Sequence, residues 1–418
     1  MMSERQPVLT TQKRDHSEAA AQEAARTTLP ASRQPPCWSA RRRRDGLFLL
    51  GVLLLSMLTI LVLANTGSSQ RGQATTAQSG SSPAPVTQTL STTSSSLIAT
   101  GTFREYPFPQ SNSQVMRLAV DHEGRLWMGE MGRNALAVFD PRTQAFQEIT
   151  PPHGRYGIMG IQVAADDTIW FAEQYANYIG HYLPITRQFH LYPLPTITTP
   201  DPSNAGKTLT LPSAPNDLAL DSHGEVWFAE FNADRLGRLD PHTGHMQQYL
   251  LAGDRTAQQL ASYGVTVDPR GMVWFTEMGV ERIGRLDPAT GRIQYFPLPG
   301  VHAPLMEIAS DAHGAIWVTS FSSGLLLQLN PHSGAVTSYY ASLTGADPGG
   351  LYGLAVTSSG DIWMTLLAQN ALARLDAATH RFVYYRVPTE NSGPLALVAG
   401  ANQILWFTET DKIGMLRP

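Results

Sequence analysis

Tryptophan recurs along most of this 418-residue chain at a nearly constant spacing. Successive intervals are 43, 57, 47, 43, 46 and 43 residues, between Trp127, Trp170, Trp227, Trp274, Trp317, Trp363 and Trp406. The same short phrase surrounds them, most clearly as WFAE at 227–230 and as WFTE at 274–277 and 406–409. A period of roughly 40 to 50 residues with Trp inside a short β-type run is typical of a β-propeller, in which each repeat forms one four-stranded blade. The sequence therefore predicts an all-β fold with seven blades.

Each repeat reads as four short strands separated by turn signals, as the fourth repeat illustrates. A first apolar strand, VTVD (265–268), is followed by the turn PRG (269–271) and then by the Trp strand. The strand RIGRLD (282–287) and the turn DPATG (287–291) lead into an outer strand that ends as YFPLP (295–299). Pro after Asp presets the backbone of a tight turn, and Gly takes the positive φ that closes the hairpin. Because one blade cannot bury its own sheet faces, the core must form where neighbouring blades stack.

The sequence also predicts how the ring closes. The last repeat stops after KIGMLRP (412–418), a third strand with no fourth behind it. Well upstream, TFREYPFP (102–109) matches the outer-strand ending and has no first three strands before it. We predict that 102–109 completes the seventh blade, which would leave no open sheet edge between the two ends of the ring. The propeller is then predicted over residues 102–418.

The chain before the propeller has the pattern of a membrane anchor. Residues 1–45 are polar and end in four arginines at 41–44, and the next 19 residues, 46–64, contain no charge. As a helix this stretch would span about 28 Å, close to the roughly 30 Å hydrocarbon thickness of a bilayer. The arginines on its N-terminal side predict a cytoplasmic N-terminus and an extracytoplasmic propeller at the cell membrane. A cleaved signal peptide is the alternative, since Val62 and Ala64 fit a small-residue cleavage site, but 45 residues before the apolar stretch is long for one.

The segment between this stretch and the propeller is predicted to be a flexible linker. Residues 65–101 are rich in Ser and Thr and poor in large apolar side chains, so burial cannot offset the entropy of ordering them. The one cysteine, Cys37, lies before the apolar stretch, so no disulfide is expected in the propeller. The net charge of −4 is small and the basic residues concentrate beside the membrane stretch, which argues against nucleic acid as a partner.

A ring of carboxylates is the first candidate site. The residue that closes each Trp strand is expected near the mouth of the central channel, and in five of seven repeats it is a glutamate: Glu130, Glu173, Glu230, Glu277 and Glu409. Converging carboxylates suit a hard cation, so we expect Mg²⁺ or Ca²⁺ as the cofactor, if there is one. Crowding would also raise the pKa of some of these groups. The alternative is a structural role, in which each Glu binds its adjoining loop.

Candidate ligand-binding residues stand where the first strands begin, or in the loops that lead into them. They are Asn216, Asp217, Tyr263, Glu307, Tyr352, His153 and His302, and Arg117 and Tyr156 are expected on the same face. No HExxH or GxSxG motif and no phosphate-binding Gly loop stands in a supporting context, so those chemistries gain no support. The insertion 196–213 enters the third blade on the mouth face. It is either a lid or a tolerated surface insertion.

The repeats resemble the streptogramin B lyases, also called virginiamycin B lyases. WFTE, RIGRLDPATG and YFPLP within 274–299 carry the resemblance, with weaker copies across 102–418. It implies a seven-bladed propeller that opens the macrocyclic ester of the antibiotic by Mg²⁺-assisted elimination, with a histidine as base. A thinner similarity, APNDLALDSHG (214–224) with Asn216, points to the six-bladed lactonases of the SMP-30 and gluconolactonase type.

The functional residues implied by the lyase resemblance are mostly replaced in this chain. The catalytic histidine falls at Leu395, the acidic residue two before it at Gly393, and a second histidine at Tyr352, so Glu409 alone matches. Loss of a general base costs a factor of roughly 10² to 10⁴ in rate. We therefore predict a module that binds a small molecule or an extracellular protein or peptide at the propeller mouth. The alternative is a metal-assisted lyase or lactonase that acts on a cyclic ester.

Overall fold

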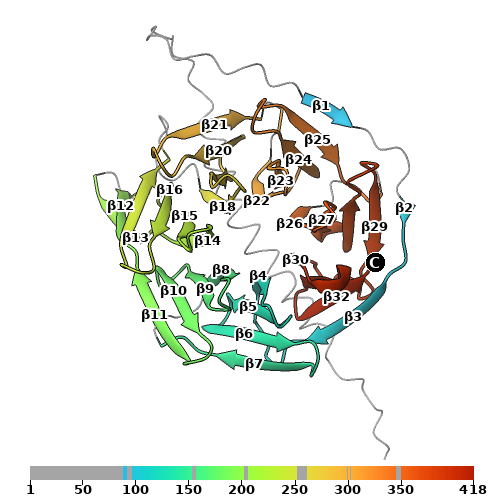
Figure 1. Ribbon diagram of the computed structural model, residues 1–418, viewed down its shortest axis with the longest axis horizontal. Coiled ribbons are helices and arrows are strands. Elements are labelled where there is room, and N and C mark those ends of the chain that lie inside the picture. Colours follow the sequence, from blue (N-terminus) through green and yellow to red (C-terminus); the bar gives the residue numbers. More distant parts are fainter. Residues whose placement is uncertain are drawn as a thin grey trace, which may run out of the picture. The chain divides into compact units, whose positions relative to one another are not determined.

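The computed structural model describes residues 88–91, 97–152, 157–201, 206–251, 261–298, 300–301, 303–344 and 350–418. Within them, seven β-sheets are arranged around a central axis (Figure 1), and the predicted all-β, seven-bladed propeller is confirmed. The helical elements of this part are the short 3-10 helices η2 (Leu367–Gln369) and η3 (Ala401–Gln403). None of its helices is long and apolar enough to cross a membrane. The predicted tail 1–45, the apolar stretch 46–64 and most of the predicted linker 65–101 lie outside the described residues.

The strands follow one another from the axis outward in every blade. Blade 1 holds β4 (Val115–Val120), β5 (Leu126–Glu130), β6 (Ala135–Asp140) and β7 (Ala145–Ile149). Blade 2 holds β8 (Ile158–Val163), β9 (Ile169–Glu173), β10 (Tyr178–Leu183) and β11 (Gln188–Pro193). Blade 3 holds β14 (Pro215–Leu220), β15 (Val226–Glu230), β16 (Arg235–Leu239) and β17 (Met246–Leu250). Blade 4 holds β18 (Ser262–Val267), β19 (Val273–Glu277), β20 (Arg282–Leu286) and β21 (Ile293–Pro297).

The remaining blades repeat this order. Blade 5 holds β22 (Leu305–Ser310), β23 (Ile316–Ser320), β24 (Leu325–Leu329) and β25 (Val336–Tyr340). Blade 6 holds β26 (Leu351–Val356), β27 (Ile362–Leu366), β28 (Ala371–Leu375) and β29 (Phe382–Arg386). Blade 7 holds β30 (Leu397–Ala399), β31 (Leu405–Thr408), β32 (Lys412–Arg417) and β3 (Thr102–Pro107). In blade 7, β3 pairs antiparallel with β32 from Thr102 opposite Arg417 to Pro107 opposite Lys412, so the predicted closure of the ring is confirmed.

The segment before β3 differs from its prediction. Two short strands, β1 (Gln88–Ser91) and β2 (Leu97–Ile98), lie inside the predicted linker and pair in parallel with β25 and β29. Figure 1 shows β1, β2 and β3 following the outside of blades 5, 6 and 7 in turn. The outer strand of a blade presents a row of unpaired N–H and C=O groups, and any extended chain can pair with it. A Ser- and Thr-rich sequence can do so without an apolar side-chain pattern, which explains why the composition did not predict these strands.

An aspartate holds the turn between the first and second strands. In blade 4, Asp268 Oδ1 accepts hydrogen bonds from the backbone N–H groups of Arg270 and Met272 at 2.9 and 3.0 Å. Its Oδ2 accepts the indole N–H of Trp274 at 2.9 Å, so the buried Trp has a partner for its one polar atom. The same indole bond recurs in Asp121–Trp127, Asp221–Trp227 and Asp311–Trp317. The repeated Asp and Trp are therefore one structural unit.

A glycine in the third strand makes room for the Phe that follows the Trp. Gly284 lies opposite Phe275 in the sheet, and a Cβ atom on it would lie 2.0 Å from the ring. The same close contact joins Phe171 to Gly180, Phe228 to Gly237 and Phe407 to Gly414. In the other three blades the opposed pairs are Met128 and Ala137, Val318 and Leu327, and Met364 and Ala373. The glycine is thus tied to the aromatic ring that packs on it.

The insertion before blade 3 forms a hairpin of β12 (Thr196–Pro200) and β13 (Thr208–Pro212). Figure 1, viewed along the axis, shows this hairpin at the periphery of the ring. It therefore does not cover the central channel. Of the two interpretations of this segment, a lid or a surface insertion, the structure agrees better with the surface insertion.

Candidate functional site

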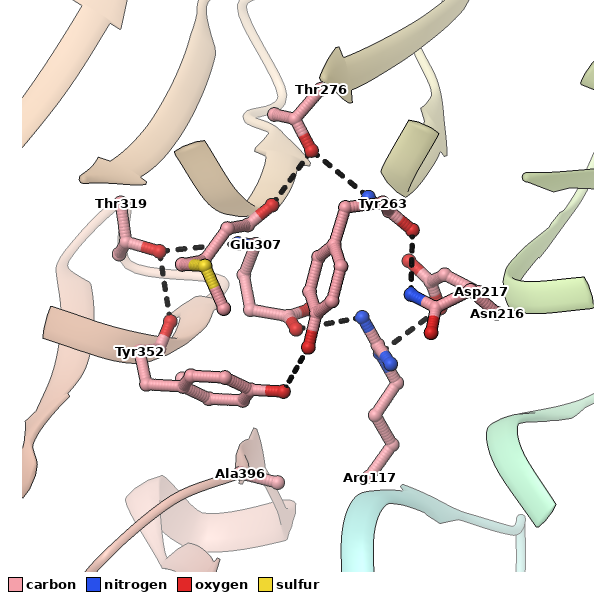
Figure 2. A network of polar contacts seen from close by, with 12 residues as sticks. Arg117, Asn216, Asp217, Tyr263, Thr276, Glu307, Thr319, Tyr352 and Ala396 are labelled. Carbon is pink, nitrogen blue, oxygen red and sulfur yellow. Dashed lines mark hydrogen bonds and ion pairs between the residues drawn. The ribbon is translucent and has the colours of Figure 1, made fainter. Parts of the chain in front are cut away.

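The candidate site lies on the innermost strands, six of which begin with an irregularity. In β4, β8, β14, β18, β22 and β26 the pairing with the second strand shifts near the mouth end of the strand. Such bulges change the direction in which side chains point. The residues inside them include Arg117, Asp217, Tyr263, Glu307 and Tyr352, which we call the central cluster. Figure 2 shows these side chains converging from five different blades.

Arg117 is the centre of this cluster. Its Nη2 donates a hydrogen bond to Glu307 Oε1 at 2.7 Å, and its Nε lies 3.1 Å from Asp217 Oδ1. The second contact is an ion pair without hydrogen-bond geometry, and Nη1 is buried with no hydrogen-bond partner at all. The guanidinium carbon lies 5.2 Å from the centre of the Tyr263 ring, and the Tyr263 and Tyr352 hydroxyls form a hydrogen bond with each other. Blade 1 is thereby connected across the channel to blades 3, 4, 5 and 6.

Burial governs the protonation of these groups. Burial raises the pKa of Glu307 to about 7 against the opposing effect of the Arg117 charge, and it also raises the pKa of Asp217. The neighbouring carboxylates more than offset the effect of burial on Arg117, whose pKa is well above its ordinary value. Burial raises the pKa of Tyr263 to about 12, so this hydroxyl is protonated at neutral pH. The cluster therefore combines one guanidinium, two carboxyls and two neutral hydroxyls.

Glycine alternates with the charged residues around the axis. The three charges come from β4, β14 and β22, whereas β8, β18 and β26 carry Gly160, Gly264 and Gly353 at the position of the charge. A Cβ atom on Gly353 would lie 2.3 Å from the backbone oxygen of Leu395, and one on Gly264 would lie 2.8 Å from that of Met306. At these positions the backbone of the next blade takes the place of a side chain. The three charged side chains therefore share the centre of the channel with Tyr263 and Tyr352 and with no side chain from these three glycine positions.

Apolar residues surround the central cluster. The mouth cluster, as we call it, consists of Met116, Met159, Ala261, Tyr263, Met278, Met306, Tyr352 and Leu395, with Met131, Phe231, Phe321 and Leu367 partly buried against it. Leu395 and Tyr352, the positions of the two family histidines, are 3 % and 0 % exposed. Gly393, the position of the acidic residue, has φ +66°, a conformation that favours glycine. The described histidines lie in hairpin turns, third strands or outer strands, remote from this cluster.

The closing glutamates, Glu130, Glu173, Glu230, Glu277 and Glu409, are all buried but do not form a ring of neighbours. Glu277 Oε2 accepts a hydrogen bond from Arg282 at 2.6 Å, Glu130 Oε2 one from Arg133 at 2.8 Å, and Glu230 Oε1 one from Gln248 at 2.7 Å. Each of these partners belongs to the same blade as its glutamate. In the part of the chain that the structure describes, no group of three or more His, Cys, Asp or Glu side chains is arranged to hold a metal ion. Within these residues the five glutamates therefore do not gather into one metal-binding group, and the binding of Mg²⁺ or Ca²⁺ stays a prediction.

The reason lies in the alternation of side chains along a strand. In VWFTE (273–277), Phe275 and Glu277 lie on one face of the sheet and Trp274 and Thr276 on the other. Phe275 packs with blade 3, whereas Thr276 Oγ1 donates to the backbone oxygen of Met306 in blade 5 at 2.8 Å. The glutamate thus points between two blades rather than into the channel. Burial without a partner raises the pKa of Glu173 to about 7, and burial also raises that of Glu409 to about 7.

The structure brings together most of the predicted ligand-binding residues. Asp217, Tyr263, Glu307 and Tyr352 belong to the central cluster, and Asn216 lies beside it, where it donates to the backbone oxygen of Tyr263 at 3.0 Å. His153 and His302, as well as Tyr156, lie outside the described residues. The sequence placed Arg117 on this face without predicting its central role. A single arginine at a position that is otherwise Gly, Ala or acidic was the available signal.

The fold and the site define a seven-bladed propeller with an ionised centre and an apolar mouth. The sequence profile of the Virginiamycin B lyase family matches residues 197–417, more than half of the chain, and the chain belongs to this family. No curated protein matches the chain at a significant level.

Solved structures show the same architecture. A streptogramin B lyase is 24 % identical with TM-score 0.67, and the match covers 76 % of this chain and 97 % of that chain. The extracellular domain of a hybrid two-component system from B. thetaiotaomicron is 16 % identical with TM-score 0.58, over 76 % of this chain and 40 % of that chain. YCF48 bound to D1 peptide is 11 % identical with TM-score 0.58, over 77 % of this chain and 97 % of that chain. At these identities the likeness establishes the fold.

Proposed function

We propose that this propeller is a binding module that takes a small molecule or a peptide segment at its mouth and does not carry out the lyase reaction. The observation that supports the proposal most is the environment of Leu395. Where the family resemblance places the base, this chain has an alkyl side chain, 3 % exposed and packed with Tyr352 in the mouth cluster. An elimination needs a group that accepts the proton from carbon, and neither residue can accept one at neutral pH.

The composition of the mouth cluster supports binding. Methionine is flexible and polarisable, and it adapts to apolar ligands of different shape. Met116, Met159, Met278 and Met306 lie in this cluster, and Phe231 and Phe321 pack against it. Ligand sites are commonly apolar surfaces with a few polar groups that fix orientation. The central cluster supplies such polar groups.

The test separates binding from chemistry. The full chain, purified in lipid nanodiscs, is incubated with a type B streptogramin and Mg²⁺, and the antibiotic is followed by chromatography and fragmentation mass spectrometry. Fragmentation is required because a ring-opening elimination leaves the mass unchanged. We expect the intact ring after prolonged incubation. Ring opening would overturn the proposal, and its loss in His153→Ala or His302→Ala would then identify the base.

One observation favours the alternative, a lyase or lactonase acting on a cyclic ester. Glu409 is the residue that matches the family pattern, and its pKa of about 7 lets it exchange a proton near neutrality. Glu409→Gln in the same assay tests it. A ring-opening activity abolished by this change would support the alternative.

We also propose that the propeller is extracytoplasmic and held at the membrane by residues 46–64. The four arginines before this apolar stretch support the orientation. Protease added to intact spheroplasts should then cut near residues 65–87 and release the propeller. A propeller that is protected until the membrane is opened would contradict this topology.

A further inference from the structure

We propose that Arg117 and Glu307 form a subsite for an uncharged amide group, with the amide oxygen on Arg117 Nη1 and the amide N–H on Glu307 Oε2. This inference rests on the proposed binding function and names the chemistry of the ligand. A primary carboxamide carries such a group on one edge, whereas a trans peptide bond points its C=O and N–H in opposite directions.

The first argument is an unused donor. Arg117 is 7 % exposed, and its Nη1 makes no hydrogen bond although it is buried. An unsatisfied buried donor costs about 1 to 3 kcal/mol, so it is retained only where something compensates for it. A bound acceptor would do so. The guanidinium points toward the centre of the cluster in Figure 2, between Asp217 and Glu307.

The second argument is an open acceptor beside that donor. Glu307 uses Oε1 for Arg117 Nη2, and its side chain keeps 16 % of its surface accessible. Arg117 Nη2 and Glu307 Oε1 hold the two groups together, which leaves Nη1 and Oε2 as flanking donor and acceptor. A primary carboxamide offers an acceptor and a donor on one edge in the reverse order, so both can be satisfied at once.

The third argument is charge. One guanidinium already faces two carboxyls, Asp217 and Glu307, so a carboxylate ligand would add a third negative group to a buried site. An ammonium ligand would meet the buried positive charge of Arg117 at the same place. A neutral amide avoids both costs. The mouth cluster, with Phe231 and Phe321 at its edge, would receive an apolar side chain next to the amide.

The experiment uses three probes that differ in one group. They are N-acetyl-4-fluorophenylalaninamide, its methyl ester analogue, which lacks the terminal N–H, and its free carboxylate. Binding to the full chain in nanodiscs is titrated by fluorine NMR at pH 8, where Glu307 with its pKa of about 7 is ionised. Empty nanodiscs correct for partition into lipid. We expect the amide to bind most tightly and the carboxylate least.

Glu307→Gln replaces the hydrogen-bond acceptor Oε2 with a donor and leaves the rest of the side chain nearly unchanged in shape. The new amide can still accept the Arg117 hydrogen bond through Oε1, but it presents a donor where Oε2 was. The amide probe should weaken by about tenfold or more, and the carboxylate probe should become the preferred ligand. Glu225→Gln is the matched control, because Glu225 forms a comparable pair with Arg238 at 2.6 and 2.8 Å in blade 3, outside the cluster. It should leave all three affinities unchanged.

Two results would overturn the inference. One is the absence of probe binding by the unchanged protein, which would make the pair a structural contact only. The other is an unchanged order of probe affinities in Glu307→Gln. If that variant does not fold, Glu307→Asp keeps the charge but withdraws the carboxylate by one methylene, and it should lose the amide probe. Failure here is distinct from failure of the proposed function, which is read as ring opening of the antibiotic.

Discussion

The closing glutamates and the central cluster are two sets of buried charges that behave in opposite ways. The glutamates repeat from blade to blade, and Glu130, Glu230 and Glu277 are paired within their own blades. The central cluster does not repeat: Arg117 occurs once, and its partners Asp217 and Glu307 come from different blades. A residue that recurs in every repeat can stabilise its own blade, whereas a residue that occurs in one repeat only can make contacts that connect different blades. In this propeller the departures identify the candidate site.

Arg117→Met should give the largest effect on stability. It leaves Asp217 and Glu307 buried without their cation, and breaking a buried ion pair from one side costs about 3 to 5 kcal/mol. Urea unfolding of the full chain, followed by tryptophan fluorescence, measures the change. Adding Asp217→Asn and Glu307→Gln to this variant should recover most of the loss, because no unpaired charge then remains. A single variant as stable as the unchanged protein would show that the cluster is not a buried ion pair.

Asp268→Ala tests a repeated residue and should cost about 2 kcal/mol. It removes the acceptor of the buried Trp274 indole N–H, and an unsatisfied buried donor costs about 1 to 3 kcal/mol. The two backbone N–H groups that lose the same acceptor are part-buried and can bind water instead. Asp268→Asn keeps an acceptor and should cost less. In contrast to Arg117→Met, no second substitution of a partner charge should restore the stability that Asp268→Ala loses. Rescue by a distant charge substitution would break the distinction between local and central residues.

The pH dependence of stability is the next test. Glu173, Glu307 and Glu409 have pKa values of about 7 in the folded protein, above the ordinary glutamate value of 4.5. Between these values the folded state binds more protons than the unfolded state, so the free energy of unfolding should fall as pH rises from about 4.5 to about 7. Carboxyls whose pKa is lowered, such as Asp240 and Asp287, act at lower pH. Glu173→Gln should reduce the slope, and an unchanged slope in urea titrations would contradict the assignment.

The smallest effects are expected from pairs of closing glutamates. Glu277→Gln and Glu230→Gln should each cost about 1 kcal/mol, since each weakens one hydrogen-bonded pair. Because the two lie in different blades with different partners, their effects should add within about 0.5 kcal/mol. Millimolar Mg²⁺ should change neither the melting temperature of the two variants nor that of the unchanged protein. A coupling well above 0.5 kcal/mol, or a rise with Mg²⁺ that the variants lose, would restore the idea of a shared site.

The sequence predicted the ring well because a propeller is a periodic object. The Trp spacing gives the number of blades, and the missing fourth strand after 412–418 points to 102–109. The orientation of the closing glutamates is harder to predict, because it depends on which face of the sheet the last residue of a strand occupies. The alternation of Phe275 and Glu277 directs Glu277 between blades. The convergence of Arg117 with Asp217 and Glu307 depends on bulges, which arise from pairing between strands and leave no clear local pattern.

The contact between Phe275 and Gly284 also constrains how the repeats can diverge. A methyl group at Gly284 collides with the ring, so the glycine cannot change before the phenylalanine does. Replacement of the ring first leaves a cavity that a larger residue opposite it can then fill. Two blades without the phenylalanine have larger residues than glycine opposite it, in the pairs Met128 with Ala137 and Val318 with Leu327. The two positions of such a pair are therefore coupled, because the residue tolerated at one depends on the side chain at the other.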